Sequence, residues 1–271
     1  MTTGTAAERA GGVAVPVDRQ LLPQRERALV LGCAIDRVLL DEAVDAIDAR
    51  IATRRPCQHV SINAAKLVKF QRDPALRAAI ARCELVTADG QSVVWAARML
   101  GQHLPERVAG IDLMHAVLAR AGERGYRVFI LGARRAVLDE AVRNLTSRDP
   151  RLTLAGWHHG YFSPADEPQV VRAIADAEAD ILFVALETPA KEQFLARHRD
   201  VLSIPFVMGV GGAIDIAANK RRRAPRWLQR LGLEWAFRLA QDPRRLARRY
   251  AIGNTQFALL VGREALRRRF A

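Results

Sequence analysis

Cysteine is scarce in this chain of 271 residues, and its three cysteines, Cys33, Cys57 and Cys83, never occur in Cys-x-x-Cys spacing. An odd, widely spaced set argues against a disulfide framework and favours a reducing compartment. Metal-binding patterns are missing too. The adjacent pair His158 and His159 lacks ligand spacing, and no Asp-x-Asp occurs anywhere. We therefore expect neither a bound metal nor another cofactor.

Long hydrophobic runs are also missing. The most apolar late run, residues 257–262, is far shorter than the roughly 20 residues that a membrane-spanning helix needs. The first 27 residues contain no continuous apolar stretch of the signal-peptide kind. We expect a protein that touches a membrane without crossing it. Residues 1–25, small, polar and interrupted by proline, are expected to form a loose tail.

Two nucleotide-binding signatures are absent. The chain contains neither Gly-x-Gly-x-x-Gly nor the Gly-x-x-x-x-Gly-Lys-Ser/Thr of a P-loop. The first absence disfavours an oxidoreductase that uses a nucleotide cofactor. No serine or cysteine stands in a recognisable nucleophile motif either.

Basic charge, by contrast, is abundant and concentrated at one end. Residues 219–271 hold 15 Lys and Arg against three acids, a net charge of +12, which leaves +1 of the total +13 for residues 1–218. Such a segment indicates an anionic partner: nucleic acid, anionic lipid or a phosphorylated substrate. It reads as helical, with Asp242 as N-cap and Pro243 as first helical residue. Four arginines then share one helix face: Arg244, Arg245, Arg248 and Arg249.

Strand and helix patterns alternate along the rest of the chain. Strands are predicted at residues 28–34, 59–63, 85–88, 127–131, 152–155, 181–186 and 206–210. Helices are predicted at residues 41–54, 73–82, 92–100, 112–121, 136–147, 168–177 and 189–198. Several strands are continuous apolar runs, as in parallel sheets buried on both faces. The pattern predicts a Rossmann-like α/β core at residues 26–218, with a mostly parallel sheet flanked by helices, and a basic helical membrane-associating appendage at residues 219–271.

The first candidate for chemistry is Asp89. It follows the strand predicted at residues 85–88, and a helix opens near Ser92, so its carboxylate is expected at the carboxyl edge of the sheet, where ligands bind in such folds. Asp-Gly is also a common turn pair. A catalytic carboxylate and a turn or capping aspartate are both compatible with this pattern.

The glycines after the last predicted strand, Gly209, Gly211 and Gly212, are a second candidate. Backbone N–H groups there can cradle an anion, or the glycines can simply make a tight turn. Asp215 follows them and either accepts hydrogen bonds from a base or ribose, or caps a helix.

Three further segments carry polar or aromatic side chains, and each side chain has a functional and a purely structural interpretation. Tyr161 can stack on a nucleobase or anchor a loop. Lys191 and Glu192 are expected near the carboxyl edge of the sheet, although an acidic residue is ordinary at a helix start. Arg107 lies in a short segment between predicted helices. Taken alone, it is interpreted as a surface arginine.

Taken together, ordered segments between about Val30 and about Asn254 resemble the WecG/TagA/CpsF family of bacterial glycosyltransferases. The segments are SINAAK, TADGQSVV, LPERVAGIDL, VFILGA, GYF, Pro-x-Lys-Glu, FVMGVGGAID, RRRAPRW, LGLEWAFR and QDPRRLARRY. Each is weak alone, but ten in the same order are specific.

The resemblance implies an inverting, metal-independent transfer from a UDP-sugar to a polyprenyl-pyrophosphate-linked saccharide in cell-surface or exopolysaccharide synthesis. It also implies a cytoplasmic protein held peripherally on the inner face of the cell membrane. Asp89 matches the general base, and Arg107 and Lys191 complete the implied catalytic set. The implied substrate-binding residues are Ser61, Asn63, Gly132, Tyr161, Glu192, Gly209, Gly211, Gly212, Asp215, Arg238, Arg245 and Arg248.

The chain departs from the family pattern at two places. Glu187 and Lys191-Glu192 stand where the family often has Gly and Gln-Glu, and Ala218-Asn219 stands where it often has Ala-Gly. Lys191 offers a cation near the sugar or phosphate in place of an amide, which hints at a different donor sugar.

The runner-up interpretation is a basic nucleic-acid-binding protein with a Rossmann-like body. The basic segment fits it, but no known nucleic-acid-reading motif is found, so nucleic acid is not the expected partner. The expected partners are a UDP-sugar, a lipid-linked saccharide and an anionic membrane surface. A homo-oligomer is also compatible with the sequence.

Overall fold

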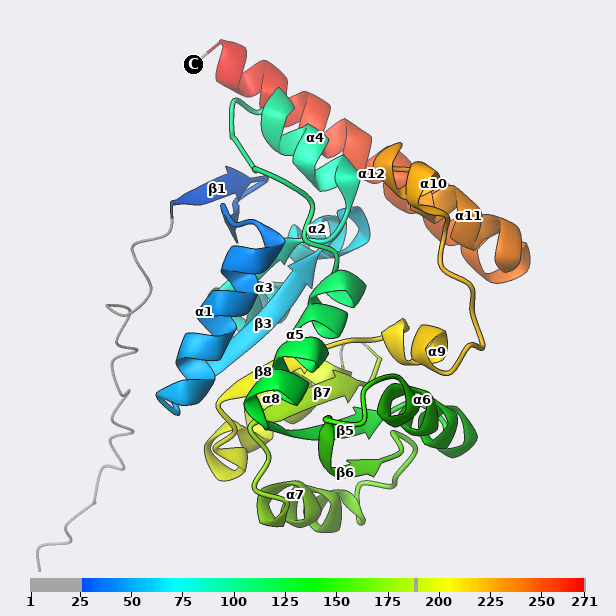
Figure 1. Cartoon of the computed structure of the whole chain (residues 1–271). Helices are drawn as coiled ribbons and strands as arrows, with labels where there is room; N and C mark the ends of the chain where they lie inside the picture. The colour runs from blue at the N-terminus through cyan, green and yellow to red at the C-terminus, as the bar shows by residue number, and fades with distance from the viewer. Residues whose placement is uncertain (1–25, 188–189, 271) are drawn as a thin grey trace, which may run out of the picture.

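A single parallel sheet organises the molecule. The computed structural model describes residues 26–187 and 190–270, so the tail predicted at residues 1–25 lies outside the described residues. The six strands are ordered β4-β3-β8-β7-β5-β6, and every neighbouring pair is parallel (Figure 1). Their bounds are β3 Cys57–Ile62, β4 Leu85–Ala88, β5 Arg127–Gly132, β6 Thr153–His158, β7 Ile181–Ala185 and β8 Phe206–Gly209. The predicted α/β class and parallel sheet are confirmed.

The prediction of a single strand at residues 28–34 is wrong. Residues 28–34 make no single strand but belong to an antiparallel hairpin of β1 (Arg27–Val30) and β2 (Cys33–Asp36). Leu31 and Gly32 turn the chain with positive φ angles of 50° and 77°, as a two-residue hairpin turn requires. Because Leu31 is a poor turn residue, the apolar run concealed the reversal.

Helices cover both faces of the sheet, because successive strand residues point to opposite sides. In β7, Ile181 and Phe183 pack into one cluster, whereas Leu182 and Val184 pack into another. The first face is covered by α1 (Leu40–Ala52), α5 (Gly110–Arg124), α6 (Arg135–Arg148) and α9 (Ala213–Ala217). The other is covered by α2 (Ala64–Phe70), α3 (Pro74–Ala81), α4 (Gln91–Met99), α7 (Glu167–Asp176) and α8 (Ala190–Leu202).

Most predicted helices are present within a few residues of their expected ends. Two short helices of the core, α2 and α9, were not among the predicted ranges. The sequence of α2 does hold an N-cap signal, since Asn63 Oδ1 accepts a hydrogen bond from the N–H of Lys66 at 3.0 Å. The helix predicted at residues 189–198 is observed from Ala190 onward, as α8, and Pro189 lies outside the described residues.

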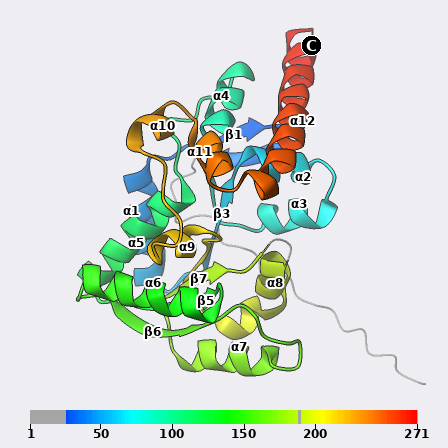
Figure 2. The same cartoon turned by 90° about the vertical axis from the view of Figure 1, so that its right-hand side faces the viewer.

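The basic segment forms α10 (Arg226–Arg230), α11 (Glu234–Gln241) and α12 (Pro243–Arg269). Asp242 and Pro243 occupy the predicted N-cap and first helical positions. Figures 1 and 2 show these helices at the β3–β4 end of the sheet, opposite β6 and α7. Phe257 and Val261 of α12 are buried in the same cluster as Leu67 of α2. The appendage therefore contributes to the hydrophobic core, and a boundary at residue 218 stays a prediction.

Candidate functional site

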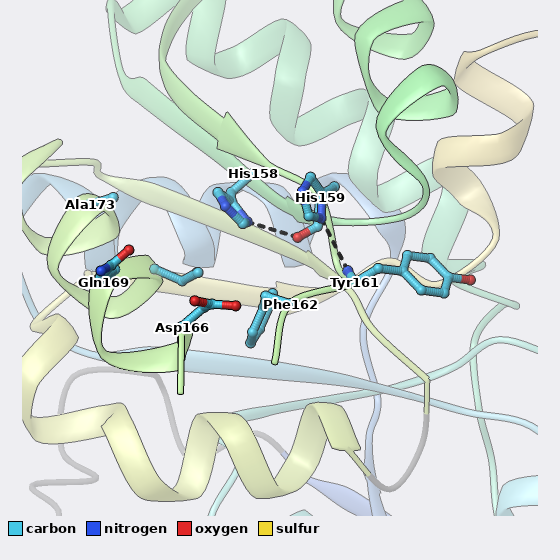
Figure 3. A pocket seen from close by; sticks show the side chains of 8 residues that line it. His158, His159, Tyr161, Phe162, Asp166, Gln169 and Ala173 are labelled. Atoms are coloured by element: carbon cyan, nitrogen blue, oxygen red, sulfur yellow. Dashed lines mark hydrogen bonds between the residues drawn. The ribbon is translucent and has the colours of Figure 1, made fainter. Parts of the chain in front are cut away.

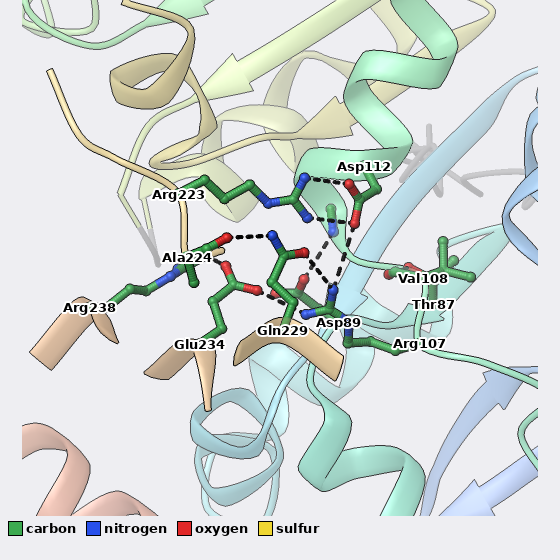
Figure 4. Close-up of polar contacts among 11 residues, drawn as sticks. Thr87, Asp89, Arg107, Val108, Asp112, Arg223, Ala224, Gln229, Glu234 and Arg238 are labelled. Atoms are coloured by element: carbon green, nitrogen blue, oxygen red, sulfur yellow. Dashed lines mark hydrogen bonds and ion pairs between the residues drawn. The ribbon is translucent and has the colours of Figure 1, made fainter. Parts of the chain in front are cut away.

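Asp89 lies at the carboxyl edge of the sheet, directly after β4. Its N–H donates to the carbonyl oxygen of Ile62, the last residue of β3, at 2.8 Å. Its Oδ1 accepts a hydrogen bond from the N–H of Gly110, the first residue of α5, at 2.9 Å (Figure 4). Asp89 therefore caps α5 and presents a carboxylate at the edge, and its catalytic role stays a prediction. No described residue donates a hydrogen bond to its second oxygen, Oδ2.

A polar layer lies beneath Asp89 on β3 and β4. His59 Nε2 and Thr87 Oγ1 are 2.9 Å apart, and Thr87 Oγ1 also donates to the carbonyl oxygen of Val108 at 3.4 Å. With the hydroxyl proton directed to Val108, His59 is the donor of the first bond. Burial, together with the positive charges of Lys66 and Lys191, lowers the pKa of His59 to about 3, so the imidazole is neutral.

Ser61 and Gly110 are in close contact. A Cβ on Gly110 would approach Ser61 Oγ to 2.8 Å, so a larger residue there would displace the Ser61 hydroxyl. Ser61 Oγ is buried and finds no hydrogen-bond partner among the described residues. Its predicted contact with substrate stays a prediction, because Gly110 covers it in this structure.

Lys191 and Glu192 reach the same edge from the start of α8. Lys191 Nζ lies 3.2 Å from Glu192 Oε1, and both side chains are only 13% exposed. A Cβ on Gly209 would lie 2.7 Å from Cδ and Cε of Lys191. The side chain of Lys191 thus lies over the last residue of β8, near the carboxyl edge of the sheet, where it was predicted.

Arg107 connects the sheet edge to the appendage. Its guanidinium contacts Glu234 Oε2 at 2.8 Å and Gln229 Oε1 at 3.3 Å, and Glu234 Oε1 accepts from Arg238 at 2.6 Å (Figure 4). Next to this group, Arg223 forms two bonds with Asp112, of 2.5 and 2.6 Å. Burial alone would raise the pKa of Glu234, but the two arginines more than offset it and hold the pKa below its ordinary value. Glu234 therefore stays ionised between them.

This contact yields a stability prediction. The side chains of Arg107 and Glu234 are each 14% exposed, so their attraction is less screened than at the surface. We expect a double-mutant cycle with Arg107→Ala and Glu234→Ala to give a coupling of about 0.5–3 kcal/mol in urea unfolding. The matched control is the exposed pair Arg143–Glu140, expected near 0–0.5 kcal/mol. Equal coupling in both pairs would contradict the prediction.

Other predicted residues lie away from Asp89. Tyr161 follows β6, which β3, β8, β7 and β5 separate from β4. The residue is 67% exposed, and the guanidinium carbon of Arg134 lies 6.0 Å from the ring centroid. Gly132 is pressed against Ala185 of β7. Asp215 lies in α9, with Arg221 Nε 4.0 Å from its carboxylate. Roles for these three in substrate binding stay predictions.

The appendage arginines differ in how closely they approach the core. Arg238 is held by Glu234. Burial alone would lower the pKa of Arg238, but Glu234 and, after it, Asp89 raise the pKa above its ordinary value, so Asp89 and Arg238 lie within electrostatic range. Arg248 is exposed on α12. The side chain of Arg245 lies outside the described residues. Of these three arginines, Arg238 is thus the one with a described interaction near Asp89, and its role in substrate binding stays a prediction.

A hollow of about 380 Å³ lies at the far end of the sheet, between the end of β6 and α7 (Figure 3). Its lining is His158, His159, Tyr161, Phe162, Asp166, Gln169, Val170 and Ala173. The rings of His158 and His159 lie 4.6 Å apart, and His158 Nδ1 contacts the carbonyl oxygen of His159 at 2.8 Å. The sheet separates this hollow from Asp89 by four strands.

Sequence reasoning missed Lys66, His59 and Glu234 as site residues. Lys66 and Glu234 stand inside the segments SINAAK and LGLEWAFR. The tertiary structure brings Lys66 within electrostatic range of Asp89, and Glu234 into contact with Arg107. Across residues 26–187 and 190–270 no three His, Cys, Asp or Glu side chains are grouped as metal ligands would be. Over the same residues, no helix has both the length and the apolar character to span a bilayer.

A parallel sheet with a carboxylate and lysines at its carboxyl edge places the chain among α/β enzymes that bind ligands at that edge. The family described as Glycosyl transferase WecG/TagA/CpsF matches residues 28–271, nearly the whole chain, and the protein therefore belongs to this family. It is a glycosyltransferase of cell-surface polymer synthesis, in a family that generally uses a sugar-nucleotide donor and a lipid-linked acceptor. The family assignment favours this class over a nucleic-acid-binding protein or an oxidoreductase.

Proposed function

We propose that the protein transfers a sugar from a UDP-sugar to a polyprenyl-pyrophosphate-linked saccharide with inversion, and that Asp89 is the general base. The observation that carries the proposal is the position of the Asp89 carboxylate. Gly110 fixes one oxygen, and the other has no donor among the described residues. A fixed carboxylate with one unengaged oxygen is suited to accept a proton from a hydroxyl.

The chemistry follows from that geometry. The acceptor hydroxyl oxygen forms a bond to the anomeric carbon while the bond from that carbon to the UDP oxygen breaks on the opposite face. Asp89 takes the hydroxyl proton, and UDP leaves with the bonding electrons. The leaving diphosphate gains negative charge, which cationic side chains stabilise most when they are positioned beforehand. Arg107, Arg238 and Lys191 are the candidates for this role, and it is their presence, with no Asp-x-Asp in the sequence, that supports a metal-independent reaction.

A transfer assay tests the reaction. Purified protein is incubated with a panel of UDP-sugars and a polyprenyl-pyrophosphate-linked saccharide, and the product is analysed by mass spectrometry and NMR. We expect one sugar to be added and its anomeric configuration to be opposite to that in the donor. Retention of configuration would contradict a single displacement with Asp89 as base.

We also propose that the appendage holds the protein on an anionic membrane surface at the inner face of the cell membrane. Four exposed apolar side chains, two on α4 and two at α10 and the residue after it, make up what we call the apolar ridge: Trp95, Met99, Trp227 and Leu231. The turn after α10 lies against α4, because a Cβ on Gly232 would lie 2.8 Å from the ring of Trp95. The exposed Arg98 and Arg226 directly precede Met99 and Trp227 in the sequence. Apolar insertion combined with basic side chains is how peripheral proteins bind anionic lipid.

Vesicle binding tests the apolar ridge. Trp227 is 61% exposed, and its transfer into the bilayer interface removes a large apolar surface from water. We expect Trp227→Ala to weaken binding to phosphatidylglycerol-containing vesicles about tenfold in a sedimentation assay. Trp157→Ala is the matched control, since Trp157 is 46% exposed on β6 at the opposite end of the sheet. Equal losses for the two variants would exclude the ridge as the docking surface.

A further inference from the structure

Two lysines flank the last residue of the central strand β8. Lys66 lies in the first turn of α2, which follows β3, and Lys191 lies in the first turn of α8, which follows β7. Because β3 and β7 are the two neighbours of β8, both helices begin on either side of its carboxyl end. The fold therefore brings together two cations that are far apart in sequence.

The two lysines differ in their partners. Lys191 is paired with Glu192 at 3.2 Å and is packed on Gly209. The Lys66 ammonium, in contrast, forms no ion pair or hydrogen bond with any described residue, although the side chain is half-buried. Withdrawing a lysine ammonium from water without a partner is unfavourable. In the absence of a ligand, the charged form of Lys66 is therefore less stabilised than that of Lys191.

The charge balance around Lys66 supports this difference. Burial, followed by the positive charge of Lys191, lowers the pKa of Lys66 to about 8, while Glu192 and Asp89 act in the opposite direction. Burial alone would raise the pKa of Glu192, but Lys191 and Lys66 more than offset it and hold the pKa below its ordinary value. Glu192 is thus ionised and interacts with both lysines, but its single negative charge does not neutralise the two positive charges. A negatively charged ligand would relieve the remaining repulsion.

We propose, on the basis of the function proposed above, that Lys66 and Lys191 form a two-lysine site for an anionic oxygen group of the sugar-nucleotide donor. That group is either the diphosphate or a carboxylate on the donor sugar. Both present oxygens that accept charge-assisted hydrogen bonds from ammonium groups. In the first case the lysines stabilise the leaving group, and in the second they select an acidic sugar.

Binding measurements with two lysine variants and three ligands test the site. Dissociation constants for UDP, UDP-glucose and UDP-glucuronic acid are measured by calorimetry at pH 7.0 for the wild-type protein and for Lys66→Met and Lys191→Met. Lys69→Met is the matched control, because Lys69 lies one turn further along α2, is 41% exposed and pairs with Asp73 at 3.7 Å. We expect tenfold or greater weakening in both site variants and no change in the control.

The ligand pattern identifies the anionic group. Equal weakening for all three ligands indicates the diphosphate, whereas weakening for UDP-glucuronic acid alone indicates the carboxylate. Unchanged constants in both variants would overturn the two-lysine site and leave the proposed transfer intact. A wild-type protein that binds none of the three uridine ligands would overturn the proposed donor, and the lysine site with it.

The wild-type protein offers a second test that needs no variant. A bound anion favours protonated Lys66, so affinity is at its maximum below the pKa of the free lysine and declines as pH rises above about 8. The decline approaches about tenfold per pH unit and is absent in Lys66→Met. Charged and titratable groups that act on Lys66, or on which it acts, come from several elements: Lys191, Glu192, Asp89, Cys83, His59 and Cys33. A wild-type affinity that stays constant from pH 7 to 9.5 would overturn the role of Lys66.

Discussion

Replacement of Asp89 by asparagine is expected to lower kcat for sugar transfer by about a hundred- to ten-thousand-fold, the usual contribution of a positioned general base. The asparagine carbonyl still accepts the hydrogen bond that Gly110 donates to Oδ1 in the wild-type protein. The N-terminus of α5 therefore keeps its cap, and only the proton-accepting oxygen is lost. We expect the KM for the UDP-sugar to change less than threefold or so, because the base acts on the acceptor hydroxyl.

Asp73→Asn is the matched control for this experiment. Asp73 also caps a helix, since its Oδ1 accepts a hydrogen bond from the N–H of Leu76 at 3.0 Å, but α3 lies away from the carboxyl edge. Both variants should unfold within about 1 kcal/mol of the wild-type protein in urea. Wild-type kcat in Asp89→Asn would remove the general base from the mechanism, whereas a similar loss in Asp73→Asn would assign the effect to helix capping.

Gly132→Ala is expected to have the largest effect on stability. Gly132 ends β5 with a φ of 128°, which L-residues rarely adopt, and an added Cβ would lie 2.5–2.7 Å from backbone atoms of Ala185 in β7. The contact is with backbone, so no side-chain rotation can relieve it. Backbone strain and overpacking each cost about 1–3 kcal/mol, so we expect the free energy of unfolding to fall by about 2–6 kcal/mol.

Gly125→Ala is the control that separates the cost of backbone strain from the cost of a steric clash. Gly125 ends α5 with a φ of 72°, but nothing lies within 4 Å of an added Cβ there. Only the left-handed conformation is penalised, at about 1–2 kcal/mol. The comparison is made by chemical denaturation of the two variants beside the wild-type protein. Equal losses would mean that β5 and β7 separate easily at Gly132, and would leave this glycine free to act in substrate binding alone.

The local sequence pattern predicts the class of fold, but it did not predict the hairpin at the start of the core. The continuous apolar run of β7 predicts a strand buried on both faces, and Ile181 and Leu182 do pack into different clusters. The same logic failed at residues 28–34, where a two-residue turn at Leu31 and Gly32 reverses the chain inside an apolar run. A hydrophobic run indicates that residues are buried, and both strands of this hairpin are partly buried. The hydrophobic pattern alone therefore does not reveal that the chain changes direction between them.

The candidate site divides in a similar way. Asp89 and Lys191 were predicted at the carboxyl edge because residues that follow parallel strands must lie there. Lys66 was missed, since α2 was not predicted and nothing in SINAAK indicates that its lysine meets a residue 125 positions later. Glu234 was missed because Arg107, the partner that connects it to the core, lies 127 positions away in the sequence, whereas Arg238 is only its i,i+4 neighbour.

The sequence by itself determined the α/β class, the parallel sheet, the basic terminal helices and the family, because these depend on local periodicity, charge and ordered motifs. Only the tertiary structure decided that α12 packs into the core beside α2, that Glu234 joins Arg107 to Arg238, and that Lys66 and Lys191 lie on either side of β8. The physical reason is that attraction and desolvation depend on distance through space, and the distances between these residues are set by strand order and helix packing.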